Sequence, residues 1–280
     1  MRTVKTAAIR DAVAAMLSKC TIDAEPFITD SFEKALETER NPVARGFLEQ
    51  LQENYRLAGQ KRLPICQDTG CDAVFVELGQ SVCLEGDYIE DMINEGIRRA
   101  TKEAYLRASM VKDPIKRGNT GDNTPAMVHY EIVPGDTVRI SVLPKGAGCE
   151  NMSRIAMLRP ADGIEGIKKV VLNAVVEGGG NHCPPLCIGV GIGGSFEKVA
   201  SLAKAALLLP FNERSGIPHI AELEDELITM INESDVGPQG LGGDTTAIGL
   251  RVLSCPTHIA SLPVAVNISC HALRRATMVL

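Results

Sequence analysis

The sequence predicts a mixed α/β protein of α+β character, with a helical N-terminal region packed on mixed β-sheets, and it does not predict a Rossmann fold. Apolar residues recur at helical spacing through residues 3–58. Beyond them, short strand patterns follow one another directly as often as they alternate with helices, which does not suit a uniform series of βαβ units. At 280 residues, 45% of them hydrophobic, the chain can form one large domain or two ordinary ones.

The first half of the chain beyond the helical region predicts a strand, a helix, a loop and a hairpin. The strand covers residues 73–78, and the helix runs over 87–109 and ends near Arg107. GNTGDNTP is a loop by composition. HYEIV and VRISVL then predict neighbouring strands of an antiparallel hairpin, joined by the Pro-Gly-Asp turn.

The second half predicts three helices and three strands around two glycine-rich loops, GGGNHCPP and VGPQGLGGDT. Ser195 is placed to cap the second helix at its N-terminus. The helices are expected over residues 164–177, 195–209 and 221–233, and the strands over 186–192, 246–254 and 263–268.

Charge, hydropathy and cysteine usage restrict the class of protein. A net charge of −6 argues against a nucleic-acid partner. No apolar run approaches the roughly 20 residues that span a bilayer, and Arg10 and Asp11 make the first twenty residues an amphipathic helix rather than a signal peptide. Nine cysteines without an export signal indicate reduced thiols and a cytoplasmic location, and most such thiols are small buried hydrophobes.

Two motifs favour ordinary structural roles. GVGIGG matches the glycine pattern of dinucleotide sites, but Glu213, the acid at the required distance, follows Pro210 in a polar loop with no strand before it. Close packing of a strand-to-helix turn is the better interpretation. The C-x4-C and C-x3-C spacings are too loose for the usual zinc knuckle.

Three cysteines lie in polar, loop-like surroundings suited to a ligand. Cys66 begins the turn in LPICQDTGCD, Cys183 lies in NHCPP, and Cys270 ends a strand in NISCHALRR. Three thiolates from distant loops can hold an iron–sulfur cluster with one iron left open. Carboxylates would then be held by nearby cations, for which the candidates are Arg107, Lys145, Arg274 and Arg275.

Several motifs together give the chain a resemblance to a known family over nearly its whole length. ICQDTG, PKGAGCENMSRIAMLRPADGIEGIKK, NHCPPLCIGVGIGG, GPQGLGGDTTAIG and HIASLPVAVNISCHALRR occur in the same order as in the α chain of iron–sulfur-dependent class I fumarases. The α chain of tartrate dehydratase is closely similar. The resemblance implies one catalytic domain over residues 1–280, which can consist of two lobes around a cluster.

The resemblance also implies the site. Cys66, Cys183 and Cys270 would ligate a [4Fe–4S] cluster. Substrate contacts would come from Gln67, Asp68, Arg107, the backbone near Gly148, and His258 in the PTHIA loop, with Asp68 and His258 as catalytic groups.

The implied activity is the reversible hydration of fumarate to malate, a step of the tricarboxylic acid cycle. Family members complete the site with groups from a C-terminal domain or a separate β chain, so we expect a β chain and an oligomer. ENMS favours fumarate, whereas Cys149 favours the alternative substrate, L-tartrate. A non-catalytic scaffold subunit carrying a metal or a cluster is the alternative from another class.

Overall fold

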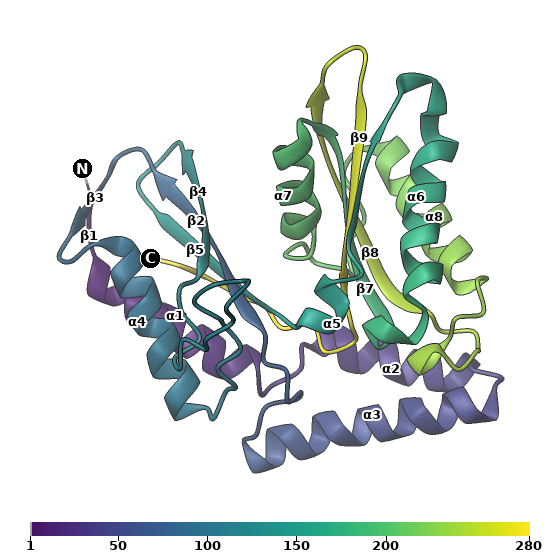
Figure 1. Ribbon diagram of the computed structural model, residues 1–280, viewed down its shortest axis with the longest axis horizontal. Helices are drawn as coiled ribbons and strands as arrows, with labels where there is room; N and C mark the ends of the chain where they lie inside the picture. The colour runs from purple at the N-terminus through teal and green to yellow at the C-terminus, as the bar shows by residue number, and fades with distance from the viewer. Residues whose placement is uncertain (1) are drawn as a thin grey trace. The chain divides into compact units, whose positions relative to one another are not determined.

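The computed structural model describes residues 2–280, which form two compact units. Unit 1 contains the described residues up to Glu25, then Asn54–Ala147 and Arg274–Leu280; unit 2 contains Pro26–Glu53 and Gly148–Leu273. Helices and mixed sheets make up both units, which confirms the predicted α+β fold (Figure 1). No helix within residues 2–280 is long and apolar enough to cross a membrane.

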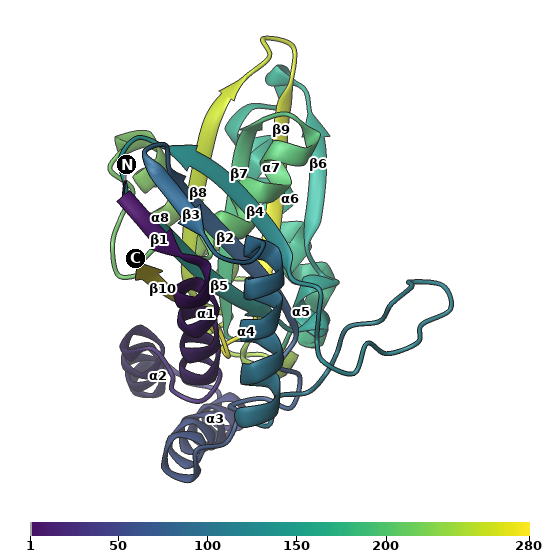
Figure 2. The same cartoon turned by 90° about the vertical axis from the view of Figure 1, so that its left-hand side faces the viewer.

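Unit 1 is built on a four-stranded sheet with the order β10-β5-β2-β4. Its helices α1 (Thr6–Cys20) and α4 (Ile89–Glu103) pack against each other, and residues of both join the hydrophobic core formed with β2 and β5 (Figure 2). A separate parallel pair, β1 (Arg2–Lys5) and β3 (Val82–Glu85), lies in the same unit. The sheet strands are β2 (Cys71–Gly79), β4 (Met127–Val133), β5 (Val138–Lys145) and β10 (Ala276–Val279).

The predicted hairpin of β4 and β5 is wrong. Both strands pair with β2, which lies between them; β4 is parallel to β2 and β5 is antiparallel to it. The Pro-Gly-Asp segment therefore passes over the end of β2, where the Gly79 amide donates to the Thr137 carbonyl at 2.9 Å. A local turn signal cannot show that a third strand occupies the place between two apparent neighbours.

Unit 2 is built on a second four-stranded sheet with the order β6-β9-β7-β8. Helix α7 covers one face of this sheet, and α6 and α8 cover the other (Figure 1). The strands are β6 (Arg154–Leu158), β7 (Leu186–Gly194), β8 (Ala247–Thr257) and β9 (Leu262–Ser269). The helices are α6 (Gly163–Gly178), α7 (Phe196–Ala206), α8 (Pro218–Asn232) and α2 (Pro26–Thr38).

The remaining elements are short, except for α3 (Pro42–Lys61), which contains one of the boundaries between the units. The predicted helix over 87–109 ends at Glu103, before Arg107. Ser195 precedes α7 as expected, but its hydroxyl donates to the Glu197 carboxylate and not to the helix. The short helices are α5 (Ala147–Glu150), η1 (Pro160–Asp162), η2 (Gly179–His182) and η3 (Pro238–Gly240).

The GVGIGG motif lies within the buried strand β7 and packs closely against α7. A Cβ atom added to Gly189 would lie 2.2 Å from the Ala203 carbonyl oxygen, and one added to Gly191 would lie 2.3 Å from the Val199 carbonyl oxygen. The glycines thus allow the helix backbone to approach the central strand, as the packing interpretation predicts.

Candidate functional site

The turn that carries Cys66, Gln67 and Asp68 lies in unit 1, between α3 and β2. Its entry is held by two hydrogen bonds: the Ile65 amide donates to the Thr21 carbonyl at 2.9 Å, and the Asn54 side-chain amide donates to the Ile65 carbonyl at 2.8 Å. Ile65 is buried beneath the turn, whereas Gln67 is exposed and Cys66 is partly exposed. The turn therefore presents a thiol, an amide and a carboxylate at the surface of a fixed backbone.

Asp68 is held on both its carboxylate and its carbonyl. Its Oδ2 accepts a hydrogen bond from the Ala147 amide at 2.9 Å, and its carbonyl accepts one from Nη1 of Arg274 at 2.7 Å. Gly146 is also close, since a Cβ there would lie 3.1 Å from Oδ2. Asp68 thus has one carboxylate oxygen fixed by backbone, which orients the other.

Arg107 lies beside this turn and is exposed. Its amide donates to Oγ1 of Thr69 at 2.9 Å, and the Thr69 hydroxyl contacts the Arg107 carbonyl at 3.2 Å. The structure therefore places the backbone of Arg107 beside the turn that carries Gln67 and Asp68.

The other predicted carboxylate-binding cations have different places. Lys145 and Arg274 are buried, and Arg274 serves the Asp68 carbonyl. Arg275 forms a bidentate ion pair with Glu25, with Nε and Nη2 at 2.7 and 2.9 Å from its carboxylate oxygens. Of the four candidates, Arg107 is the one exposed to a ligand at this turn.

Asn123 supports the end of the turn with its side chain, a role that is not apparent in the sequence. Its side-chain amide donates to the Gly70 carbonyl at 3.0 Å and to the Asp72 carboxylate at 2.9 Å. Burial raises the pKa of Asp72 to about 7, although the Asn123 hydrogen bond and the Arg274 charge oppose that shift. Asn123 has a positive φ of 61°, a backbone conformation that asparagine tolerates, and its only signal in the sequence is its place in the GNTGDNTP loop.

In unit 2, Cys183 and Cys270 lie at the same end of the sheet. Cys183 comes three residues before β7, and Cys270 directly follows β9. The two strands are antiparallel neighbours with Cys187 opposite Ser269, so the start of one lies beside the end of the other. Cys183 is exposed with a φ of 51°, and Cys270 is partly buried against the core.

Each of these cysteines has a buried histidine next to it in the chain. His182 is fully buried, and its Nε2 donates to the Val175 carbonyl at 2.9 Å. Its ring packs on Gly178, where a Cβ would lie 2.3 Å away. Burial lowers the pKa of His182, which favours the neutral ring. His271 is buried too, with its ring edge-on to Phe32 at a centroid distance of 6.0 Å.

The glycine-rich loop before β8 packs on the Cys183 loop. The Gln239 backbone and side-chain amides both donate to the Pro184 carbonyl, at 3.0 and 2.8 Å. The same loop is held by the buried carboxylate of Glu39, which accepts the amides of Asp244 and Thr245. The glycine-rich loop, itself held by Glu39, therefore supports the Cys183 loop through Gln239.

Gly148 also lies at this loop. A Cβ added to it would lie 3.4 Å from the Asn181 carbonyl oxygen, two residues from Cys183. Next to it, Cys149 is buried in the core of unit 2. Glu150 pairs with Lys204 and accepts a hydrogen bond from Asn267 at 3.0 Å, which fixes the segment on α7 and β9.

His258 does not lie with these residues. It is exposed in the turn between β8 and β9 and directly follows Thr257, which pairs with the last residue of β7. Cys183 precedes the first residue of β7, and a strand of nine residues is about 30 Å long. The structure therefore does not bring His258 together with Cys183 and Cys270, because the sheet length separates them.

Of the remaining cysteines, three are buried: Cys20, Cys149 and Cys187. Burial raises the pKa of Cys20 to about 12, so that it is a poor source of thiolate. Among residues 2–280 no disulfide joins any pair of the nine cysteines. Within either unit, the described His, Cys, Asp and Glu side chains form no group of three that could hold a metal ion.

Two comparisons with known proteins, one with a family model and one with individual proteins, place the chain in the same family. The sequence matches the family description "Fumarate hydratase (Fumerase)" over residues 10–279. It is 38% identical over 274 residues to a Methanocaldococcus jannaschii protein named "Putative L(+)-tartrate dehydratase subunit alpha", and the match covers 96% of each chain. It is 34% identical to the L(+)-tartrate dehydratase subunit alpha of Escherichia coli (strain UTI89), over 90% of this chain and 84% of that one. The chain belongs to the fumarate hydratase (Fumerase) family.

Proposed function

We propose that this chain is the α subunit of a hydro-lyase that removes water from a small 2-hydroxy dicarboxylate or adds it back. The observation that carries the proposal is the Cys66 turn, where hydrogen bonds hold the Asp68 carboxylate and the Arg107 backbone next to Gln67. An amide and a guanidinium can bind a carboxylate, and a carboxylate of fixed orientation can transfer a proton. Membership of the fumarate hydratase family supports this reaction class.

L(+)-Tartrate is the substrate that we propose first. The relatives described above carry the name of tartrate dehydratase α subunits, and Cys149 follows the pattern expected of that activity. Fumarate and malate are the second candidates, supported by the ENMS segment and by the family description. The comparisons thus favour the alternative over the expectation of fumarate.

We propose that Cys66 of unit 1 and Cys183 and Cys270 of unit 2 hold a [4Fe–4S] cluster. The donor set fits such a group in three respects. Each residue is a thiol outside any disulfide, each is at least partly exposed, and each follows or precedes a strand or helix on a supported loop. Cys183 and Cys270 share one end of the sheet. When bound, the cluster would supply a Lewis acid that polarises the C–O bond.

The roles of the chain's own residues follow from their positions. Arg107 would pair with one substrate carboxylate, and the Gln67 amide and the backbone near Gly148 would donate to substrate oxygens. Asp68, with Oδ2 held by the Ala147 amide, would use its other oxygen to carry the proton of the departing or entering hydroxyl. His258 lies at the opposite end of the unit 2 sheet from Cys183, so no role beside Cys183 and Cys270 is proposed for it.

A β chain is proposed to supply the base that removes the proton on the carbon next to the other carboxylate. The relatives' names as α subunits support such a partner. Without that base, the C–H bond that must break has no acceptor for its proton, so the α chain alone should be nearly inactive. The nine cysteines outside disulfides also support a reducing, cytoplasmic compartment for the assembled oligomer.

The test is an anaerobic assay of the reconstituted α chain with and without the β chain of this family from the same organism. L(+)-tartrate, D-tartrate, meso-tartrate, malate and fumarate are compared by kcat/KM. Loss of water from tartrate gives an enol that becomes oxaloacetate, which is measured directly. We expect turnover of L(+)-tartrate that needs both chains. A brown, cluster-loaded complex without turnover of any of the five acids would favour a scaffold subunit.

A further inference from the structure

Residues 108–122, called the arm below, form a segment that stands out from unit 1 (Figure 2). The arm returns on itself without a regular strand, joined by one bridge between Val111 and Asn119. The Lys112 amide donates to the Gly118 carbonyl at 2.7 Å, and the Thr120 amide donates to the Met110 carbonyl at 2.9 Å. The arm therefore has a defined shape without a core of its own.

The tip of the arm is an ordered turn. The Asp113 carboxylate accepts the amides of Ile115 and Lys116 at 2.9 and 2.6 Å, and its carbonyl accepts the Arg117 amide at 2.9 Å. The one acidic side chain of the tip is thus occupied by backbone. Its fixed geometry lowers the conformational entropy that a binding partner would have to remove.

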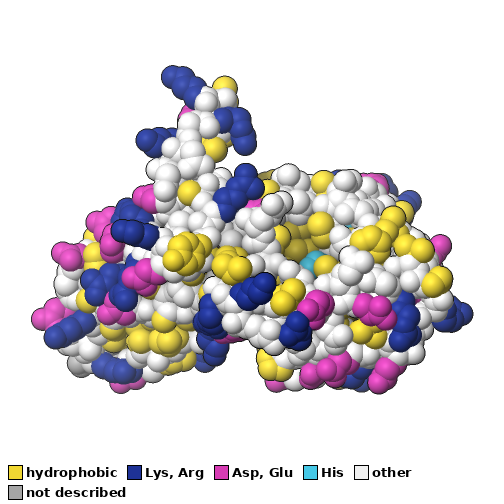
Figure 3. Space-filling view, turned by 90° about the horizontal axis from the view of Figure 1, so that it is seen from below, with side chains coloured by type: hydrophobic (Ala, Val, Ile, Leu, Met, Phe, Trp, Pro, Cys, Tyr) yellow, Lys and Arg dark blue, Asp and Glu magenta, His cyan; other side chains and the backbone are white. Residues whose placement is uncertain are grey.

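An apolar side chain and three positive charges project from this turn. Ile115 is 88% exposed at the tip of the arm. Lys112, Lys116 and Arg117 are exposed, and within residues 2–280 none of them has a carboxylate in ion-pairing range. Figure 3 shows the projection with dark-blue basic side chains along it. In a chain of net charge −6, this is a local excess of positive charge.

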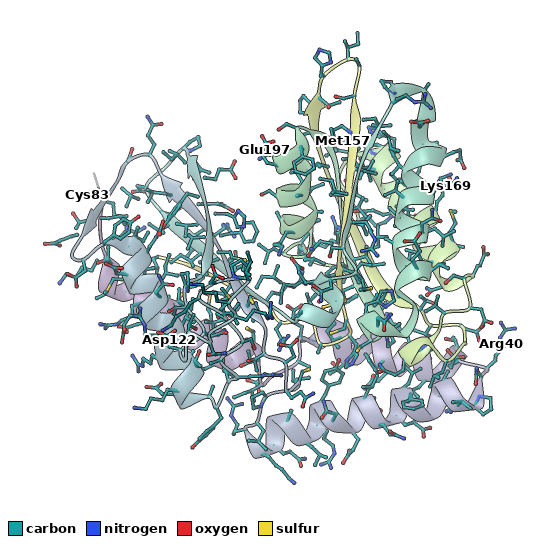
Figure 4. All side chains as sticks on the ribbon, in the orientation of Figure 1. Arg40, Cys83, Asp122, Met157, Lys169 and Glu197 are labelled. Carbon is teal, nitrogen blue, oxygen red and sulfur yellow. The ribbon has the colours of Figure 1, made fainter. Side chains whose placement is uncertain are left out.

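The base of the arm is joined to the Cys66 turn. The Ser109 amide donates to Oδ1 of Asn123 at 2.8 Å, and Asn123 in turn donates to the Gly70 carbonyl. Asp122, labelled in Figure 4, pairs with Arg98 of α4 at 3.0 Å. Arg107 directly precedes the arm. A partner bound to the arm would therefore lie next to the residues that we place at the substrate.

We propose that the arm is a docking element for the β chain, and that it inserts Ile115 into an apolar pocket rimmed by acidic side chains. This inference rests on the proposed function, which requires a partner that completes the site beside Arg107. The three unpaired cations would speed association and orient the partner, while burial of Ile115 would slow dissociation. The arm thus specifies where on the α chain the β chain binds, which the proposed chemistry alone does not.

The central experiment measures the affinity of the full-length α chain for the family's β chain by isothermal titration calorimetry. Ile115→Asp should weaken binding about 30-fold, because a charge would enter an apolar pocket. Ile259→Asp is the matched control, since Ile259 is 91% exposed in the β8–β9 turn and should change the affinity less than about twofold. Melting temperatures of both variants should equal that of the wild type.

A second pair of variants tests the charges. Lys112→Glu combined with Lys116→Glu should slow association about tenfold at low salt, and the difference should shrink as salt rises. Lys19→Glu combined with Lys102→Glu makes the same change of charge on α1 and α4 and should leave the association rate near that of the wild type. Hydrogen exchange on the wild type adds an independent readout: the amides of Lys112 and Thr120 should exchange more slowly once the β chain is added.

Each result decides between the proposals. If the wild type does not bind the β chain, the proposed partner fails and the arm proposal fails with it. If the wild type binds but Ile115→Asp binds equally well and exchange at the arm is unchanged, the docking role alone is overturned. A self-association of the α chain that Ile115→Asp abolishes, with normal β-chain binding, would assign the arm to a second copy instead.

Discussion

The two units support their candidate residues in different ways. In unit 2, Cys183 and Cys270 lie at the ends of β7 and β9, neighbours in a sheet whose central strand is buried. In unit 1, Cys66, Asp68 and Arg107 lie on irregular backbone, held by side chains such as Asn123 and Arg274 that come from distant parts of the chain. Regular strands lead into the two cysteines of unit 2, whereas a few buried hydrogen bonds position the candidate residues of unit 1.

This difference determines how each set can be damaged. A sheet distributes its hydrogen bonds over many residues, so the strand ends next to Cys183 and Cys270 should tolerate the loss of a single polar contact. The Cys66 turn depends on individual buried side chains. Removal of one of them would leave its hydrogen-bond partner buried without a bond. Changes to unit 2 should therefore act through packing, and changes to unit 1 through buried polar groups.

The largest expected effect tests whether both units contribute ligands. Cys66→Ser, Cys183→Ser and Cys270→Ser should each abolish cluster incorporation after anaerobic reconstitution, because serine is a poor ligand for iron in such clusters. Iron content and visible absorption measure the result, with activity as a further readout. Cys20→Ser, Cys71→Ser and Cys255→Ser are the controls and should retain full iron. Normal loading of Cys66→Ser would restrict the ligand set to unit 2.

The next effect concerns unit 1 alone. Asp68→Asn keeps the shape of the side chain and an oxygen for the Ala147 amide, but it cannot carry a proton. We expect kcat to fall by about 10²- to 10⁴-fold with an unchanged cluster spectrum and melting temperature. Arg107→Ala should instead raise KM strongly, because it removes a carboxylate contact. If Asp68→Asn kept wild-type kcat, the proton would have to travel through another group.

Packing in unit 2 is tested at the central strand. Gly191→Ala would place a Cβ 2.3 Å from the Val199 carbonyl oxygen, so that α7 must move, and we expect a loss of about 3 kcal/mol in unfolding free energy. Gly46→Ala, in α3 of the same unit, meets nothing within 4 Å and should stabilise by up to about 1 kcal/mol. Urea unfolding measures both. Equal stabilities of the two variants would contradict the close-packing role of the β7 glycines.

The smallest expected effect is a pH dependence from unit 1. The pKa of Asp72 is raised from 3.8 to about 7 in the folded protein, so the folded state holds a proton that the unfolded state has released. Stability from this group therefore falls as pH rises between those values and is constant above them. Between pH 5.5 and 7.5, the wild type should lose about 2 kcal/mol relative to Asp72→Asn. Asp87→Asn, at an exposed aspartate, should follow the wild-type curve.

Much of the local structure of unit 2 could be predicted from the sequence. The β7 pattern is a continuous apolar run, and the structure buries it as the central strand with Cys183 before it. The GVGIGG motif favours close packing over a dinucleotide site, and the closeness of α7 to Gly189 and Gly191 confirms this. These features depend on neighbours in the chain or on a hydrophobic period, and both are visible in one sequence.

The sequence by itself determined the α+β fold class, the family, and the chemical character of the residues on the Cys66, Cys183 and Cys270 loops. Only the tertiary structure decided that β2 separates β4 from β5, that His258 lies a full strand length from Cys183, and that Arg274 and Arg275 are already engaged. The physical reason is the distance along the chain over which each property is decided. Side-chain chemistry and hydrophobic periodicity are local properties, whereas strand order and the partner of a buried charge depend on contacts between residues that are far apart in the chain.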